Sequence, residues 1–131
     1  MEIHFTIIGI LLIPLSIVHI IFPRYFDWGR ELKPLSLINR QMIYVHTFFV
    51  ALTVLMIGIL CLTSAGELIK TNLGKKICLG LGIFWTLRLT IQFFGYSSLL
   101  WKGKMFETIV HIFFALFWAY MSIVFFAGYL H

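Results

Sequence analysis

Charged side chains are scarce in this sequence. Asp, Glu, Lys and Arg make up 11% of its 131 residues, whereas hydrophobic residues make up 61%. A soluble domain carries roughly 25% charged residues, which cover its water-facing surface. A soluble globular protein is therefore excluded, because such a surface cannot be built from so few charges. A chain of 131 residues ordinarily forms one domain, and we predict that this domain is embedded in a lipid bilayer.

Cysteine is also scarce, and the short motifs of several enzyme classes are missing. Cys61 and Cys78 are too few for a disulfide framework and form no CxxC motif, so we interpret them as buried, inert thiols. No Gly-rich phosphate loop or nucleophile elbow is present. The net charge of +5 is modest and the basic residues lie between apolar runs, so we predict no nucleic-acid partner. The sequence identifies no reaction and no catalytic residue.

Four long apolar runs dominate what is present. Each is long enough to cross a membrane, because about 20 helical residues at roughly 1.5 Å each cover a hydrocarbon core of about 30 Å. Short connections make neighbouring helices antiparallel. We therefore predict an all-α fold, an integral membrane up-down-up-down four-helix bundle. It forms a single domain over residues 1–131, with spans at about 3–22, 39–63, 77–100 and 105–129.

The connections differ in character. Residues 23–38 mix charged residues with Tyr25, Phe26 and Trp28. Because amphipathic aromatic rings settle at the level of the lipid headgroups, we predict an interfacial segment of short helical pieces broken by Gly29 and Pro34. Residues 64–76, by contrast, are predicted to be a plain polar loop.

Basic residues are distributed unevenly between the two ends of the predicted bundle. One end has six and the other has three: Arg24, Arg30, Lys33, Arg40, Lys102 and Lys104 against Lys70, Lys75 and Lys76. Cytoplasmic loops carry an excess of Lys and Arg. We therefore predict a multi-pass protein of the plasma (inner) membrane, with the more basic end in the cytoplasm and both termini outside.

The histidines of three spans converge at the more basic end. His19 lies near the end of the first span, whereas His46 and His111 lie near the beginnings of the second and fourth. At 1.5 Å per residue, all three lie roughly 5–9 Å inside the hydrocarbon boundary. Gln92 of the third span lies only a few ångströms deeper. Since costly polar groups within spans face the bundle interior, we predict that these side chains share one inward layer.

Arg88, near the centre of the third span, needs an acceptor. A central Arg costs about 2.5–3.5 kcal/mol, and a guanidinium cannot lose its charge. Glu107 is the only acidic residue within a predicted span and shares a helix face with His111. Water or Gln92 between the two side chains could bridge Arg88 to Glu107. Otherwise the acceptors are backbone carbonyls, such as those freed near Pro14, or the anionic group of a ligand. We predict one inward cluster: His19, His46, Arg88, Gln92, Glu107 and His111.

The tryptophans divide by depth. Trp28 and Trp101 lie near span ends, as does Tyr129, and we interpret all three as interfacial anchors. Trp85 and Trp118 lie deeper, and we interpret them as core filling.

The cluster is compatible with a purely structural role. Polar bonds between membrane helices contribute about 0.6–2 kcal/mol each. On this interpretation the protein is an accessory or structural component of a membrane assembly. Its partners are the lipid bilayer and either further copies of itself or a larger membrane complex.

Two alternatives involve a cofactor. The first is a membrane redox protein that binds haem b through His46 and His111, or through His19 and His111, since facing imidazoles suit bis-histidine ligation. A quinone could use the same site, and its cofactor-binding residues would be His19, His46, His111, Gln92 and Arg88. The second alternative is a centre for a divalent transition metal, with His19, His46 and His111 as ligands and Glu107 as the fourth ligand or as proton acceptor.

Overall fold

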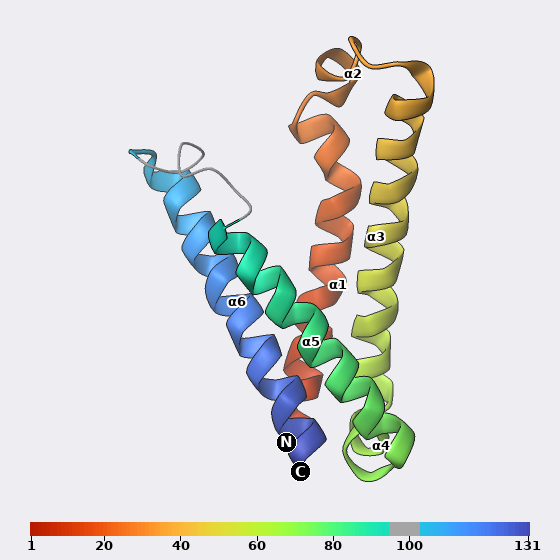
Figure 1. Cartoon of the computed structure of the whole chain (residues 1–131), viewed down its shortest axis with the longest axis vertical. Helices are drawn as coiled ribbons and strands as arrows, with labels where there is room; N and C mark the ends of the chain where they lie inside the picture. The colour runs from red at the N-terminus through yellow and green to blue at the C-terminus, as the bar shows by residue number, and fades with distance from the viewer. Residues whose placement is uncertain (95–102) are drawn as a thin grey trace. The chain divides into compact units, whose positions relative to one another are not determined.

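Helices account for nearly all of the residues that the structure describes. The computed structural model describes residues 1–94 and 103–131. The helices in these ranges are α1 (Glu2–Tyr25), α2 (Trp28–Glu31), α3 (Leu37–Thr63), α4 (Ala65–Lys70), α5 (Asn72–Phe94) and α6 (Met105–Leu130). No strand occurs in these two residue ranges. The predicted all-α class is confirmed, with four long apolar helices that are compatible with a four-helix membrane bundle (Figure 1).

The four long helices have the length and composition of membrane spans. The shortest, α5, has 23 residues and the longest, α3, has 27. At 1.5 Å per residue both exceed a hydrocarbon core of about 30 Å. Large apolar side chains such as Leu116 and Ile123 are 66% and 68% exposed, which a lipid environment accommodates. The chain is a small polytopic membrane protein.

The helix ends differ from the predicted span limits by a few residues. α1 continues through Pro23 to Tyr25, and α5 begins at Asn72, ahead of the predicted start at residue 77. Ser36 caps α3, since its side chain accepts a hydrogen bond from the backbone N–H of Asn39 at 3.4 Å. The predicted end of the third span at residue 100, together with Trp101 and Lys102, falls on residues 95–102, outside the described residues.

The prediction of a plain polar loop over residues 64–76 is wrong. This stretch contains α4 and the first turn of α5, joined at Thr71. The Thr71 hydroxyl donates to the backbone oxygen of Glu67 at 2.7 Å and accepts from the N–H of Gly74 at 2.9 Å. Leu68 and Ile69 of α4 are buried. The polar composition of this stretch predicted a loop, but the stretch forms a helical corner, α4 followed by the start of α5, in which Leu68 and Ile69 are buried.

The predicted interfacial segment contains one short helix. α2 follows Asp27, which has a left-handed φ of 52°. Gly29 lies inside α2 and does not break it, whereas the helix ends before Pro34 as predicted. The Trp28 ring meets the Tyr44 ring edge-on, with centroids 5.6 Å apart, and this contact ties α2 to α3. The position of the segment at the headgroups stays a prediction.

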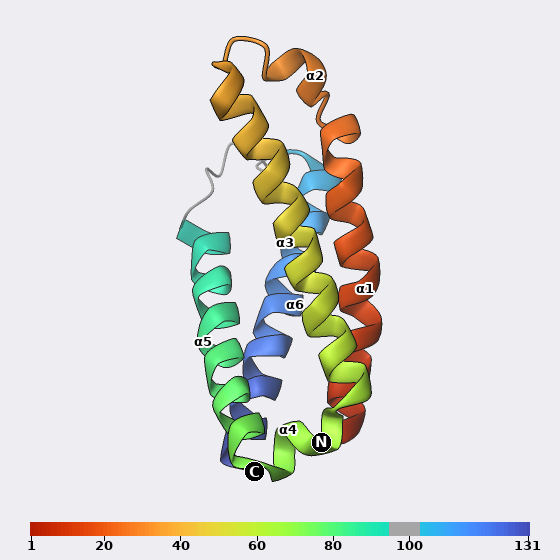
Figure 2. The ribbon, with the colours of Figure 1, turned by 90° about the vertical axis from the view of Figure 1, so that its right-hand side faces the viewer.

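The described residues divide into two compact units. The α1–α3 unit comprises residues 3–65, and the α5–α6 unit comprises residues 66–131 with residues 1–2. Each contains an antiparallel pair of long helices, α1 beside α3 and α5 beside α6 (Figures 1 and 2). Within the first unit α1 and α3 approach closely where Gly9 faces Gly58, because neither residue has a side chain to keep the backbones apart.

Replacing Gly9 with alanine is expected to destabilise the α1–α3 unit by about 1–3 kcal/mol. The added Cβ would lie 2.5 Å from Cγ of Leu62 and 2.7 Å from the backbone oxygen of Gly58, so the helices would have to separate. Unfolding in a denaturing detergent measures this change. Gly29→Ala is the control, since its Cβ would meet nothing within 4 Å. Equal stabilities of the two variants would contradict the close crossing.

Candidate functional site

Polar and aromatic side chains gather between α5 and α6. Trp85, Arg88 and Gln92 lie on one face of α5, because their separations of three and four residues match the helical repeat. His111 and Trp118, two turns apart, lie on one face of α6. Trp85, Gln92 and Trp118 are buried, whereas Arg88 and His111 are half-buried. We call these five residues the α5–α6 cluster.

Gln92 is the centre of the cluster. Its Oε1 accepts hydrogen bonds from Nη1 of Arg88 at 3.3 Å and from Nε1 of Trp118 at 3.4 Å. Its Nε2 lies 2.9 Å from Nδ1 of His111. One buried amide, 7% exposed, therefore connects three side chains and joins the two helices.

These contacts fix the proton on His111. Arg and Trp side chains only donate hydrogen bonds, so the Gln92 atom that faces Arg88 and Trp118 must be the amide oxygen. The amide nitrogen then faces His111 and donates to it. Nδ1 of His111 must therefore be the unprotonated ring nitrogen, which makes this residue the neutral Nε2–H tautomer.

The positive charge of Arg88 is stabilised by an aromatic ring as well as by the hydrogen bond to Gln92. Its guanidinium carbon lies 5.1 Å from the centroid of the Trp118 ring, within the range of a cation–π interaction. The Trp118 ring in turn stacks on Trp85, with centroids 5.0 Å apart and planes 7° from parallel. The sequence suggested Gln92 only as a bridge between Arg88 and Glu107, whereas in the structure Gln92 is itself the acceptor and Glu107 is exposed.

The tryptophans have a larger role than predicted. Trp85 and Trp118 are 3% and 5% exposed, so their interpretation as core residues is confirmed. The sequence did not reveal that Trp118 bonds to Gln92 and lies against Arg88. The sequence spacing could have indicated this position, because Trp118 follows His111 by seven residues and so shares its face of α6. Nε1 of Trp85 is buried and has no hydrogen-bond partner among the described residues.

His19 and His46 belong to the α1–α3 unit. Nδ1 of His19 lies 2.8 Å from the backbone oxygen of Leu15, to which it donates within its own helix. The His19 ring also contacts Phe22, with centroids 4.8 Å apart. His46 is exposed. The structure brings together Arg88, Gln92 and His111 from the predicted cluster, and the convergence of His19 and His46 with them stays a prediction.

The geometry gives no support to a metal centre. Over residues 1–94 and 103–131, no group of three or more His, Cys, Asp or Glu side chains could hold a metal ion. The predicted ligand set of His19, His46, His111 and Glu107 draws on both units, and its assembly stays a prediction.

Comparisons with protein-family models, with curated proteins and with solved structures find no match to this chain. Its class is defined by the fold and the cluster alone. It is a polytopic membrane protein in which an Arg–Gln–His–Trp network joins two neighbouring spans.

Proposed function

We propose that this protein is an accessory or structural component of a membrane assembly, in which the α5–α6 cluster fixes the packing of two helices. The observation that carries the proposal is the bonding of Gln92. Both ends of its amide are used by neighbours in the same unit, as expected of polar groups that hold membrane helices together.

The tautomer of His111 favours this role over haem or metal ligation. A ligating imidazole offers a lone pair to the metal, and the Nε2 atom of this tautomer carries a proton instead. Moving that proton to Nδ1 would set an N–H group against the Nε2 amide of Gln92. Rotating the amide would then turn its NH₂ group toward Arg88 and Trp118, which are donors themselves. Ligation through His111 therefore costs hydrogen bonds that the packing role keeps.

Such a component would contact its partners through the exposed faces of its long helices. Its long helices expose apolar side chains that suit either lipid or the helices of another subunit. The partners of the proposal are the bilayer and a larger membrane complex or further copies of this chain. We place the protein in the plasma (inner) membrane with both termini outside the cytoplasm, which reporter fusions at each terminus would test.

Variants of His111 test the proposal. His111→Gln keeps a side-chain acceptor and is expected to retain most of the stability, whereas His111→Leu is expected to lose about 1–2 kcal/mol because Gln92 Nε2 is left unpaired. Protein purified from cells supplied with ample haem is expected to show no Soret band. Assembly into its complex on a native gel should survive His111→Gln.

A Soret band or stoichiometric metal that disappears in His111→Gln would overturn the packing role. Loss of assembly in a His111→Gln protein of normal stability would do the same, since it would show that the imidazole has a chemical function.

A quinone site is the second candidate, and one observation favours it. A buried N–H group without an acceptor is destabilising, and Nε1 of Trp85 is such a group among the described residues. A quinone carbonyl is an acceptor of suitable chemistry. Extraction of the purified protein with organic solvent should recover a quinone from the wild type and not from Trp85→Phe if this candidate is correct.

A further inference from the structure

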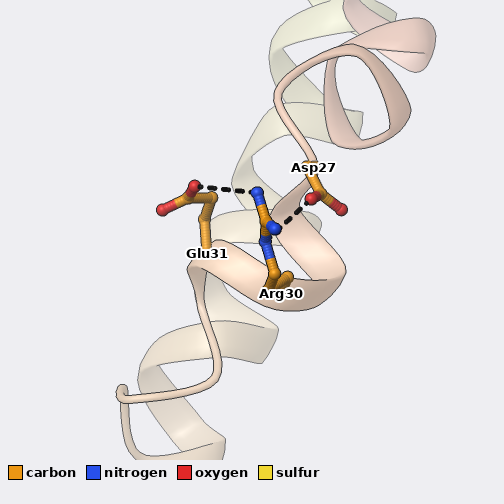
Figure 3. Close-up of polar contacts among 3 residues, drawn as sticks. All are labelled: Asp27, Arg30 and Glu31. Carbon is orange, nitrogen blue, oxygen red and sulfur yellow. Dashed lines mark ion pairs between the residues drawn. The ribbon is translucent and has the colours of Figure 1, made fainter.

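Within the described residues, the ion pairs of the α2 region leave three cations of the α1–α3 unit without a carboxylate. Arg30 is bonded to both acidic residues of this region, with Nε 3.1 Å from Oδ2 of Asp27 and Nη2 3.8 Å from Oε1 of Glu31 (Figure 3). Three further basic residues occur on the C-terminal turn of α1, after α2 and in the first turn of α3: Arg24, Lys33 and Arg40. In the part of the chain that the structure describes, these three form no ion pair. We call them the basic corner.

Arg40 shows most clearly that an acceptor is needed. It is half-buried in α3, and its Nε is buried with no hydrogen-bond partner among the described residues. A guanidinium stays protonated, so Arg40 cannot lower the cost of its buried, unpaired N–H group by losing a proton. Asp27 and Glu31 already pair with Arg30. An anion from outside the protein would complete the site.

Aromatic residues indicate where the basic corner lies. Tyr25 and Phe26 are 67% and 51% exposed, next to Arg24 at the end of α1. Trp28 packs edge-on against Tyr44 of α3, which is 40% exposed. Exposed aromatic rings at the ends of membrane-spanning helices gather at the headgroup level. The cations of the basic corner would therefore stand among lipid phosphates.

We propose that the basic corner binds the headgroup of an anionic phospholipid. Arg40 and Arg24 offer guanidinium groups whose N–H donors suit phosphate oxygens, and Lys33 adds a mobile ammonium. The pairing of Asp27 and Glu31 with Arg30 has a function on this view, because it keeps two carboxylates from competing with the lipid phosphate. The site lies wholly within the α1–α3 unit and does not depend on the role of the α5–α6 cluster.

Spin-labelled lipids test the proposal on the full chain reconstituted in bilayers. The measured quantity is the ratio of protein-associated phosphatidylglycerol to phosphatidylcholine. One basic residue near an anionic surface contributes roughly a fivefold preference. The triple variant Arg24→Gln, Lys33→Gln, Arg40→Gln is expected to lower the ratio at least fivefold. The matched control Lys70→Gln, Lys75→Gln, Lys76→Gln removes the same charge from α4 and the first turns of α5 and is expected to lower the ratio clearly less than the triple variant does.

A second pair of variants works in the opposite direction. Asp27→Asn with Glu31→Gln releases Arg30 toward the lipid and is expected to raise the ratio several-fold, and asparagine tolerates the left-handed backbone at residue 27. Glu2→Gln with Glu67→Gln makes the same charge change and should have a smaller effect. This pair still decides the matter where the triple variant does not fold.

Equal effects of the corner variants and their controls would show only a response to net charge and would overturn the proposal. So would a wild-type ratio near one. Inorganic phosphate is added in a last arm and compared with chloride at matched ionic strength. Loss of the preference in phosphate alone would mean that the corner takes a free anion and not a lipid.

Discussion

Replacing Gln92 with leucine is expected to lower the free energy of unfolding by about 2–4 kcal/mol. Leucine is of similar size but cannot accept from Arg88 or Trp118, and it cannot donate to His111. Three hydrogen bonds are lost together, and the groups left behind lie buried or half-buried between the helices. Since a guanidinium stays charged, the loss at Arg88 cannot be relieved by neutralisation.

Unfolding in mixed micelles at increasing denaturing detergent measures this change. Thr90→Leu is the matched control on the same helix, because the exposed Thr90 hydroxyl bonds, among the described residues, only to the backbone oxygen of Thr86, at 3.0 Å. Its effect is expected to stay within about 0.5 kcal/mol. Gln92→Glu keeps the acceptor for Arg88 and Trp118 and should fall between the two. If Gln92→Leu is as stable as the control, the amide does not hold α5 and α6 together.

Gln92 and His111 show what the sequence could predict. Counting residues from the connection between the third and fourth spans placed both side chains in one layer, and they lie 2.9 Å apart. The count works because helical rise is constant and the two helices are antiparallel neighbours. The four-residue interval between Arg88 and Gln92 likewise predicted a shared face, and the two side chains bond.

The position of Trp118 could not be predicted by counting residues along the helices. Its place beside Arg88 depends on how each helix is rotated about its axis and on which rotamer the guanidinium adopts. A long Arg side chain on a helix usually points toward the N-terminus. Here Arg88 reaches Gln92, one turn toward the C-terminus, because its acceptor lies on that side. The tautomer of His111 could not be predicted either, because it follows from the three hydrogen bonds of Gln92, which residue counts do not reveal.

The connection after α3 shows the same limit in the fold. Its charged and Gly residues predicted a loop, and local composition favours that reading. The buried pair Leu68 and Ile69 instead stabilises α4 through tertiary packing. The Sγ atom of Cys78, in α5, donates to the backbone oxygen of Leu68 at 3.5 Å and adds a second link. Packing between elements overrides weak local propensity, and it is not visible in a short stretch of sequence.

Replacing Gly74 with alanine is expected to destabilise this corner by about 3 kcal/mol, near the upper end of overpacking costs. The added Cβ would overlap the backbone oxygen of Glu67. It would also lie 2.6 Å from Cα and 2.8 Å from the backbone oxygen of Leu68. All three atoms belong to the backbone of α4, so no side-chain rotation can relieve the clash. The start of α5 would have to move away from α4, and the Cys78–Leu68 contact would open.

Gly80→Ala provides the control for Gly74→Ala on the same helix. Its Cβ would meet nothing within 4 Å, so only helix propensity changes, with an expected gain of up to about 1 kcal/mol. The two substitutions are chemically identical and are expected to have opposite signs in the same detergent unfolding assay. A faster reaction of Cys78 with a thiol reagent should accompany Gly74→Ala alone, because that thiol is buried by the α4–α5 contact. Equal stability of the two variants would mean that α4 does not pack on α5 as the structure has it.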